Sequence, residues 1–304
     1  MSLSITTTFA GTQSLPYVSA SLFQGKTLEN NWVKIYTDIK KSTVISKMDF
    51  GNLVQAYAAS FNASGTLTKG ECVLTPTDLM VNFEYDKKQL ESDWESMKMN
   101  PGAGKSAPPA EFVSYVLDLM GRQTSQEVEF NLWRGNFTGS TSTLSGYTKF
   151  TGILRTIDTC AGTVKVNKTG AFSATNITTN IDLAFAQVPG QLLDKEDLGI
   201  YVSPSSAMMY KQALAGFSNE SSYAKDYSLN YLGKEIRPCA GVPNDMIVVA
   251  QPGAIAFGTD LTSDSNSVRI VDLSDTTGSL TLRYRSDFKA GICVPYCTEV
   301  VWVR

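Results

Sequence analysis

The chain contains no histidine among its 304 residues. Histidine is the commonest general base near neutral pH and a frequent zinc ligand, so its absence excludes Ser-His-Asp catalysis, Cys-His catalysis and histidine-bound metal. The cysteines are too scattered to supply the close pairs of an all-cysteine zinc site. Glu127 and Glu129 are two residues apart on an expected helix and do not face each other. We therefore expect no catalytic residues, no metal site and no cofactor.

Positive charge is scarce at the start of the chain, where no lysine or arginine precedes Lys26. The start therefore lacks the basic region of a secretory signal peptide, and no apolar run reaches the length of a membrane helix. We expect synthesis in the cytoplasm and no membrane contact. The net charge of −3 gives no basic footprint, so any contact with nucleic acid is expected to be non-specific.

The chain contains five cysteines, which is an odd number, and it is large enough to build a core without disulfides. Cys293 and Cys297 would meet on a helix, but Val294 and Pro295 between them indicate extended structure. Four extended residues span about 13 Å, which is beyond the reach of a disulfide. We therefore expect unpaired, buried thiols at Cys72, Cys160, Cys239, Cys293 and Cys297.

The first third of the chain reads as an arm, a helix and a long hairpin. Residues 1–27 are rich in Ser, Thr and Gly and cannot form a core of their own. Apolar residues at helical spacing predict a helix over residues 28–39. Residues 43–87 read as extended structure, with a polar tip at residues 62–65 and strict alternation from Leu79 to Tyr85. A short helical piece is expected at residues 89–97.

The middle of the chain carries its strongest helical pattern. Pro108 and Pro109 open a helix that runs to Arg134, followed by Gly135. At 1.5 Å per residue, this helix would be about 40 Å long. A further helix is predicted from Ile177 to Val188, where a Pro-Gly pair ends it.

The most informative stretch runs from residue 199 to residue 258. An apolar strand at residues 199–202 leads into Ser203-Pro204, which is an N-cap followed by proline at the first helical position. The helix that they open is expected to end at Gly216. Residues 231–236 then precede a turn at residues 241–245, and an apolar run at residues 254–257 follows a second strand at 246–250. Further strands are predicted at residues 268–273, 280–285 and 299–303. The mixture of helices and strands in irregular alternation predicts an α+β fold.

This order of elements resembles the HK97-like fold of the major capsid proteins of tailed bacteriophages. The resemblance implies an N-terminal arm, an extended loop, a peripheral domain crossed by a spine helix, an axial domain and a return to the peripheral domain. These parts correspond to residues 1–42, 43–87, 88–170 with the spine helix at 108–135, 171–270 and 271–304. No charged, helical scaffolding segment precedes Gly25, and no residue motif for covalent cross-linking is found.

The resemblance also implies a function without an enzyme activity. The protein would self-assemble, as hexamers and pentamers, into an icosahedral shell enclosing double-stranded phage DNA. Its other partners would be separate scaffolding, portal and decoration proteins, and the virion capsid would be built in the cytoplasm of the host bacterium. Phe61, Leu67 and Lys69 near the hairpin tip are the expected subunit contacts. Replacing Phe61 and Leu67 with aspartate should block shell formation while leaving the monomer folded.

Three other classes of protein compete with this interpretation. An encapsulin-type nanocompartment shares the fold but encloses an enzyme cargo. The Thr, Ser and Asn content is compatible with an extracellular adhesin-like or pilus-like β protein, which the missing export signal and the long helix disfavour. A histidine-free hydrolase or transferase would need a constellation of reactive residues that the sequence does not contain.

Overall fold

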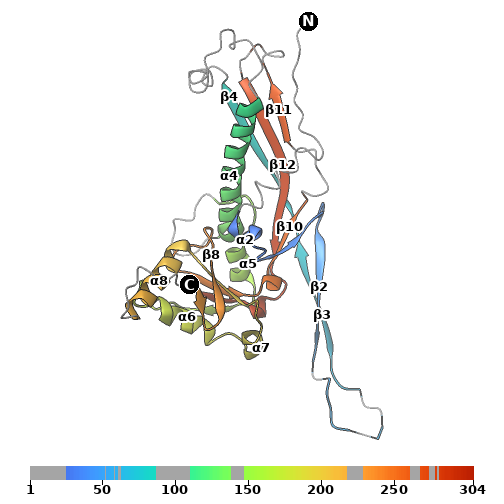
Figure 1. Cartoon of the computed structure of the whole chain (residues 1–304). Helices are drawn as coiled ribbons and strands as arrows, with labels where there is room; N and C mark the ends of the chain where they lie inside the picture. Colours follow the sequence, from blue (N-terminus) through green and yellow to red (C-terminus); the bar gives the residue numbers. More distant parts are fainter. Residues whose placement is uncertain are drawn as a thin grey trace.

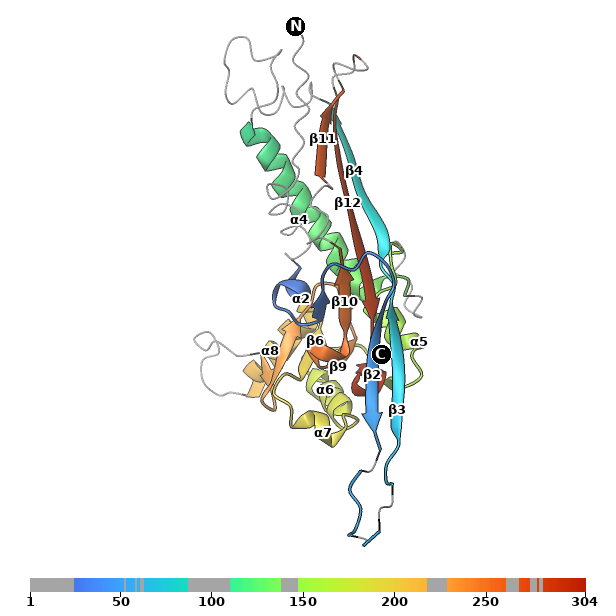
Figure 2. The same ribbon diagram turned by 90° about the vertical axis from the view of Figure 1, so that its right-hand side faces the viewer.

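The structure is a computed structural model that describes residues 25–51, 53–57, 59–60, 63–86, 110–137, 147–217, 229–260, 268–273, 278 and 281–304. Figure 1 shows an elongated molecule in which a long helix and a sheet form one end and a compact mixed domain forms the other. A thin hairpin extends beside the compact domain and past it, as Figure 2 shows from a second direction. The predicted helix at residues 89–97 and most of the N-terminal arm lie outside the described residues.

The first sheet is built around the long strand β12 (Thr281–Cys293). One edge of β12 pairs antiparallel with β4 (Thr77–Asp86), from Thr281 opposite Asp86 to Ala290 opposite Thr77. The other edge pairs with β11 (Val268–Asp272) and then with β10 (Ala256–Thr259). The short strand β1 (Lys34–Tyr36) joins β10 in parallel and completes the five strands.

Helix α4 (Ala110–Arg134) lies along this sheet and confirms the predicted long helix. Its C-terminal turns bury Val128, Leu132 and Trp133 in the larger core of the molecule. Helix α5 (Ile153–Thr159) packs against the same end of α4 and contributes to that core. The C-terminal turns of α4, together with α5, thus join the long helix to the compact domain.

The compact domain contains a six-stranded sheet with helices on its outer side. The strand order is β5-β13-β9-β6-β8-β7. The strands are β5 (Val164–Val166), β6 (Gly199–Val202), β7 (Asn230–Tyr231), β8 (Lys234–Pro238), β9 (Ile247–Ala250) and β13 (Val301–Val303). The helices are α6 (Ile177–Phe185), α7 (Gly190–Leu193) and α8 (Pro204–Phe217). The predicted cap of α8 is confirmed, because the Ser206 N–H donates to Ser203 Oγ at 3.1 Å.

The two faces of this sheet belong to two different cores. Side chains alternate along a strand, so neighbours in sequence point to opposite faces. Ile200, Val249 and Val301 are buried with α6 and α8. Tyr201, Val248 and Trp302 are buried in the core that α4 and α5 line. The sheet is covered on both faces, which is why these strands read as continuous apolar runs.

The predicted hairpin is confirmed for residues 43–74. Its strands are β2 (Thr43–Phe50) and β3 (Leu67–Leu74), and they pair antiparallel from Thr43 opposite Leu74 to Phe50 opposite Leu67. The strand that follows, β4, leaves the hairpin and joins the first sheet. The expected extended loop of residues 43–87 therefore consists of a free-standing hairpin and one strand of the main body.

The predicted helix over residues 28–39 is wrong. Helix α2 (Lys26–Glu29) is only four residues long, and Asn31 has a φ of 52°, which ends the helical path. Ile35 and Tyr36 then pair with Phe257 and Gly258 in the first sheet. The helical spacing of the apolar residues was coincidental, because a strand partner more than 200 positions later decides the structure here.

Sheet membership does not follow the expected domain ranges. Strand β13, from the range 271–304, and strand β5, from the range 88–170, lie side by side in the six-stranded sheet with strands from the range 171–270. Strand β10 falls in the expected axial range 171–270 but belongs to the first sheet. Short apolar strands carry no local feature that tells which of two buried sheets they join.

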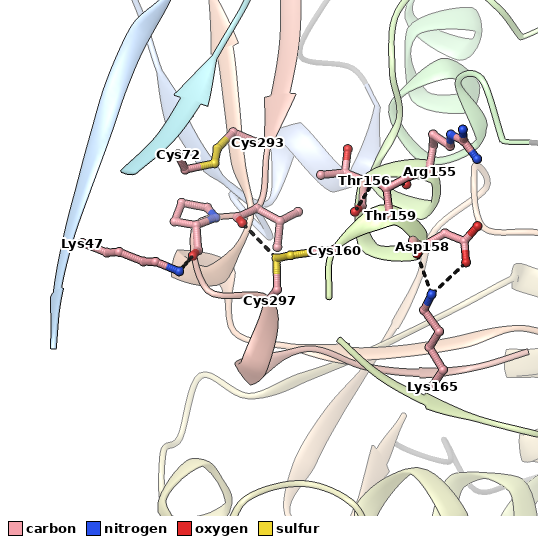
Figure 3. The surroundings of a disulfide bond; sticks show 12 residues. Lys47, Cys72, Arg155, Thr156, Asp158, Thr159, Cys160, Lys165, Cys293 and Cys297 are labelled. Atoms are coloured by element: carbon pink, nitrogen blue, oxygen red, sulfur yellow. Dashed lines mark hydrogen bonds and ion pairs between the residues drawn. A yellow bond between two sulfur atoms is a disulfide. The ribbon is translucent and has the colours of Figure 1, made fainter. Parts of the chain in front are cut away.

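The prediction of five unpaired thiols is wrong for four of them. Disulfides join Cys72 to Cys293 and Cys160 to Cys297, as Figure 3 shows. Cys239 remains a free, buried thiol, and Cys293 and Cys297 are not bonded to each other. The bonded partners are 221 and 137 residues apart in sequence, so spacing gave no indication of them.

Candidate functional site

The hairpin has two faces of opposite character, because residues paired across two strands point to the same side. The inner face consists of Thr43, Ile45, Lys47, Thr68, Gly70, Cys72 and Leu74. The outer face consists of Val44, Ser46, Met48, Phe50, Leu67, Lys69, Glu71 and Val73. One of these two faces is fastened to the chain's own body, and the other is exposed.

The inner face anchors the hairpin root to the main body. Leu74 is completely buried, in a small cluster with Ile39, Ala256 and Cys293. The disulfide Cys72–Cys293 lies next to this cluster. The contact farther along the ribbon is a hydrogen bond of 3.2 Å that Lys47 Nζ donates to Pro295 O. These contacts fix the end of the ribbon at which it leaves the body.

Glycine opposite Lys47 allows this lysine to lie across the ribbon. A Cβ atom added to Gly70 would lie 2.5 Å from Lys47 Cε, so the lysine side chain occupies the space that any other residue would fill. The Lys47 ammonium group thereby reaches the main-chain oxygen of Pro295. Lys47 and Gly70 are therefore both part of the anchor on the inner face.

The outer face exposes large apolar side chains to solvent. Val44, Met48, Phe50, Leu67 and Val73 have exposed fractions between 49% and 59%. Two strands alone bury too little apolar surface to be stable in water, and a group of large exposed apolar side chains marks an interaction site. This face therefore has the character of an interaction surface.

The connection between the two strands continues the apolar character. Leu53 is 59% exposed, and Val54 and Tyr57 are almost fully exposed, at 95% and 96%. All three residues lie in the part of the chain that directly follows β2. The outer face together with these three residues is the candidate functional site, and we call it the hairpin surface.

The expected contact residues fall partly on this surface. Leu67 and Lys69 lie on the outer face, opposite Phe50 and Met48 respectively. Phe61 lies outside the described residues. Sequence reasoning did not select Met48, Phe50, Val44 or Val73, although apolar residues at even positions of residues 44–50 could have indicated them.

A second group of polar residues lies buried beside α4. Thr27 Oγ1 donates a hydrogen bond to Glu129, and the Thr27 main-chain N–H also bonds to that carboxyl group. Trp133 Nε1 donates to Thr27 Oγ1 at 3.0 Å. The Glu129 side chain thereby supplies the cap that Gly25, at the N-cap of α2, does not have. These bonds fasten the segment after the N-terminal arm to the long helix.

This polar group does not have the properties of an active site. Burial raises the pKa of Glu129 and raises the pKa of the nearby Cys239 thiol. A thiol with a raised pKa is a poor nucleophile, because the thiolate is the reactive form. A cavity of about 340 Å³ adjoins Glu129, lined also by Gly25, Lys26 and Arg122. The group is a structural fastening between α2 and α4.

The described ranges contain neither a metal-binding cluster nor a helix that could span a membrane. No cluster of three or more Cys, Asp or Glu side chains there has the arrangement to hold a metal ion. No helix in the same ranges combines the length and the apolar character needed to cross a bilayer.

Comparison with known proteins gives matches by structure alone. No protein-family model matches the sequence. No curated protein matches it either. Among solved structures, the capsid of a native GTA particle is similar with a TM-score of 0.59 and 13% identity over 91% of this chain and 89% of that one.

Two other structures are similar over nearly their whole length. The satellite phage P4 procapsid, solved with its size determination protein, matches with a TM-score of 0.53 and 13% identity over 97% of this chain and 99% of that one. The virus-like particle from Pyrococcus furiosus matches with a TM-score of 0.54 and 9% identity over 95% and 96%. This chain therefore has the HK97-like capsid fold.

Proposed function

We propose that this chain is a major capsid protein that self-assembles into the icosahedral shell of a tailed phage around double-stranded DNA. The observation that carries the proposal is the hairpin surface. Its apolar side chains are exposed in the single chain, while its inner face is fastened to the chain's own body. An exposed apolar surface of this kind marks a site that a second molecule covers.

A second copy of the same chain is the occupant that a shell requires. The hairpin projects beyond the body, so it reaches a different part of a neighbouring copy rather than the same hairpin. Such a head-to-tail contact repeats from copy to copy and closes into rings when the rotation between copies is suitable. Hexamers and pentamers are rings of this type, and together they close a shell.

The energy available on the hairpin surface fits a stable contact. Complete burial of one large apolar side chain contributes about 1.5–3 kcal/mol. The apolar residues of the surface are Val44, Met48, Phe50, Leu53, Val54, Tyr57, Leu67 and Val73. Burying them gives on the order of 10 kcal/mol before the cost of association is subtracted. In a ring, the hairpin surface of each subunit is covered by one neighbour, and the same subunit covers the hairpin surface of its other neighbour.

The parts of the chain take corresponding roles in this proposal. Residues 1–42 are assigned to the arm, of which residues 34–36 join the first sheet as β1, and the hairpin of residues 43–74 is the extended loop. The first sheet and α4 form the peripheral domain, and the six-stranded sheet with α6, α7 and α8 forms the axial domain. Phe61, Leu67 and Lys69 contribute to the contact between subunits.

The proposal also includes partners and a place of assembly. Shells form in the cytoplasm of the host bacterium, with separate scaffolding, portal and decoration proteins. With a net charge of −3, the shell contacts its packaged DNA only non-specifically. The similarity to structures described as a capsid and as a procapsid supports this assignment, at low sequence identity.

The test compares two single substitutions on neighbouring positions of β3. Leu67→Asp places a charge on the outer face, and Thr68→Lys places a charge on the exposed inner face. Light scattering after size-exclusion chromatography should show large assemblies for wild type and for Thr68→Lys, and monomers for Leu67→Asp. Circular dichroism confirms that both variants fold. Normal assembly of Leu67→Asp would contradict the assigned role of the hairpin surface.

A further inference from the structure

The short segment of residues 293–297 joins the two sheets of the molecule. Cys293 is the last residue of β12 in the first sheet, and Cys297 begins the turn that leads into β13 in the second. Any change in the position of this segment therefore changes how the two sheets meet. We call it the connector.

Three elements from elsewhere in the chain are fastened to the connector (Figure 3). Cys72 of β3 is bonded to Cys293, and Lys47 of β2 donates a hydrogen bond to Pro295 O at 3.2 Å. Cys160, at the C-cap of α5, is bonded to Cys297. The hairpin, the spine-helix side of the core and both sheets thus meet at five consecutive residues.

In each of the two disulfides, one cysteine is more exposed to solvent than the other. Cys293 is 2% exposed and Cys297 is 8% exposed, while Cys72 and Cys160 are only half-buried. Each pair thus has one cysteine that an external reagent can reach and one that is enclosed behind it. Cys239, by contrast, is 0% exposed and lies in neither pair.

We propose that these two pairs form a redox-controlled brace that locks the hairpin and the two sheets onto the connector. In a reducing cytoplasm all four residues are thiols, because cellular thiols keep cysteines reduced there. Transfer to an oxidising environment forms both bonds. The brace sets the direction in which the hairpin leaves the body, and it deepens the proposed function because that direction decides which part of a neighbour the hairpin reaches.

The oxidant is a small external disulfide such as oxidised glutathione. The thiolate of Cys72 attacks one sulfur of the reagent, forms a mixed disulfide and releases one glutathione thiolate. The Cys293 thiolate then attacks the Cys72 sulfur, which forms the protein disulfide and releases the second glutathione thiolate. Two electrons and two protons leave the cysteine pair, and one oxidised glutathione becomes two reduced ones. Cys160 and Cys297 react in the same way with a second molecule.

The reduced hairpin keeps only the non-covalent part of its anchor. Leu74 remains buried, and Lys47 remains bonded to Pro295 O, but the covalent link at Cys72 is absent. Leu74 lies at the root, and the Lys47 contact farther along the ribbon is one hydrogen bond from the end of a long, flexible side chain, so the ribbon can change its direction around the root. Oxidation removes this freedom at the hairpin, and the Cys160–Cys297 bond does the same between α5 and the second sheet.

The first experiment maps the bonds in the full-length protein. The protein is purified under reducing conditions, exposed to oxidised glutathione, and digested without reduction for mass spectrometry. We expect peptides that link Cys72 to Cys293 and Cys160 to Cys297, with Cys239 recovered as a thiol. Free thiols at these four positions, or links in other combinations, would overturn the proposal.

The second experiment measures the effect on the hairpin in full-length protein that carries Leu67→Asp. Hydrogen exchange of the β2 and β3 amides should be slower after oxidation than before. The added substitution Cys72→Ser should abolish this difference, whereas Cys160→Ser and Cys239→Ala should preserve it. Equal exchange in the reduced and oxidised forms would overturn the brace. The comparison is made within one oligomeric state, so failure of shell assembly and failure of the brace are distinguished.

Discussion

Gly135, directly after α4, and Gly152, directly before α5, are in main-chain contact: the Gly152 N–H donates to Gly135 O at 2.8 Å. A Cβ atom added to Gly152 would lie 2.5 Å from Gly135 N, and one added to Gly135 would lie 2.1 Å from Phe150 O. These neighbours are main-chain atoms, which cannot rotate out of the way. The position of the spine helix on the core therefore depends on two glycines.

We expect Gly152→Ala to destabilise the chain by about 1–3 kcal/mol, in the range typical of overpacked cores. Urea denaturation followed by tryptophan fluorescence measures this loss, since Trp133 is buried at the same end of α4. Gly190→Ala is the matched control, because no atom lies within 4 Å of the added methyl group. Equal denaturation midpoints for the two variants would show that α4 and α5 do not need this close contact.

Glu129 gives a prediction about pH. Burial raises the pKa of its carboxyl group above the unfolded value, so the folded chain binds the proton more tightly than the unfolded chain. The protonated carboxyl group therefore stabilises the folded chain fully at pH values below the pKa that it has in the unfolded chain, about 4.3. This stabilisation is lost as pH rises through the folded pKa. At higher pH the buried negative charge of Glu129 therefore lowers the free energy of unfolding of wild type. A neutral side chain at this position does not have this effect.

Glu129→Gln should accordingly raise the melting temperature relative to wild type, and the gain should grow as pH rises above 4. Each kcal/mol of penalty removed corresponds to about 2–4 °C for a chain of this size class. Melting curves over a series of pH values check this, with exposed Glu127→Gln as the control. A gain that is constant with pH would show that the charge of Glu129 is not the cause.

Tyr201 connects the six-stranded sheet to the segment before β1. Its hydroxyl donates to Trp32 O and accepts a hydrogen bond from Arg237 Nη1 at 3.0 Å, in a fully buried position. Tyr201→Phe leaves both partners without this bond, so we expect a loss of about 1–3 kcal/mol. Exposed Tyr57→Phe should leave the denaturation midpoint unchanged. A neutral effect of Tyr201→Phe would mean that water or another group replaces the hydroxyl.

Local patterns were sufficient to predict the elements that local forces determine. The helix after Pro109 and the strand, cap and helix around Ser203 each carry their own start and stop residues, and both are confirmed. The segment at residues 28–39 failed because its strand pairs with β10, far away in the sequence. The disulfides were missed for the same reason, since Cys72 meets Cys293 only after the hairpin root has packed.

The candidate site was predicted only in part, for a reason of register. Leu67 and Lys69 were selected by their closeness to the tip, and the pairing places them on the outer face. Met48 and Phe50 complete that face, but their contribution depends on which residue of β2 lies opposite which residue of β3. A shift of one residue would exchange the two faces, so the sequence of one strand alone did not determine the surface.

Electron cryomicroscopy of particles formed by the full-length wild-type chain tests the central claim most directly. The account predicts closed shells of hexamers and pentamers, in which the outer face of each hairpin, including Phe50 and Leu67, is covered by a neighbouring subunit. A chain that remains monomeric, or a shell in which this face points into solvent, would contradict it.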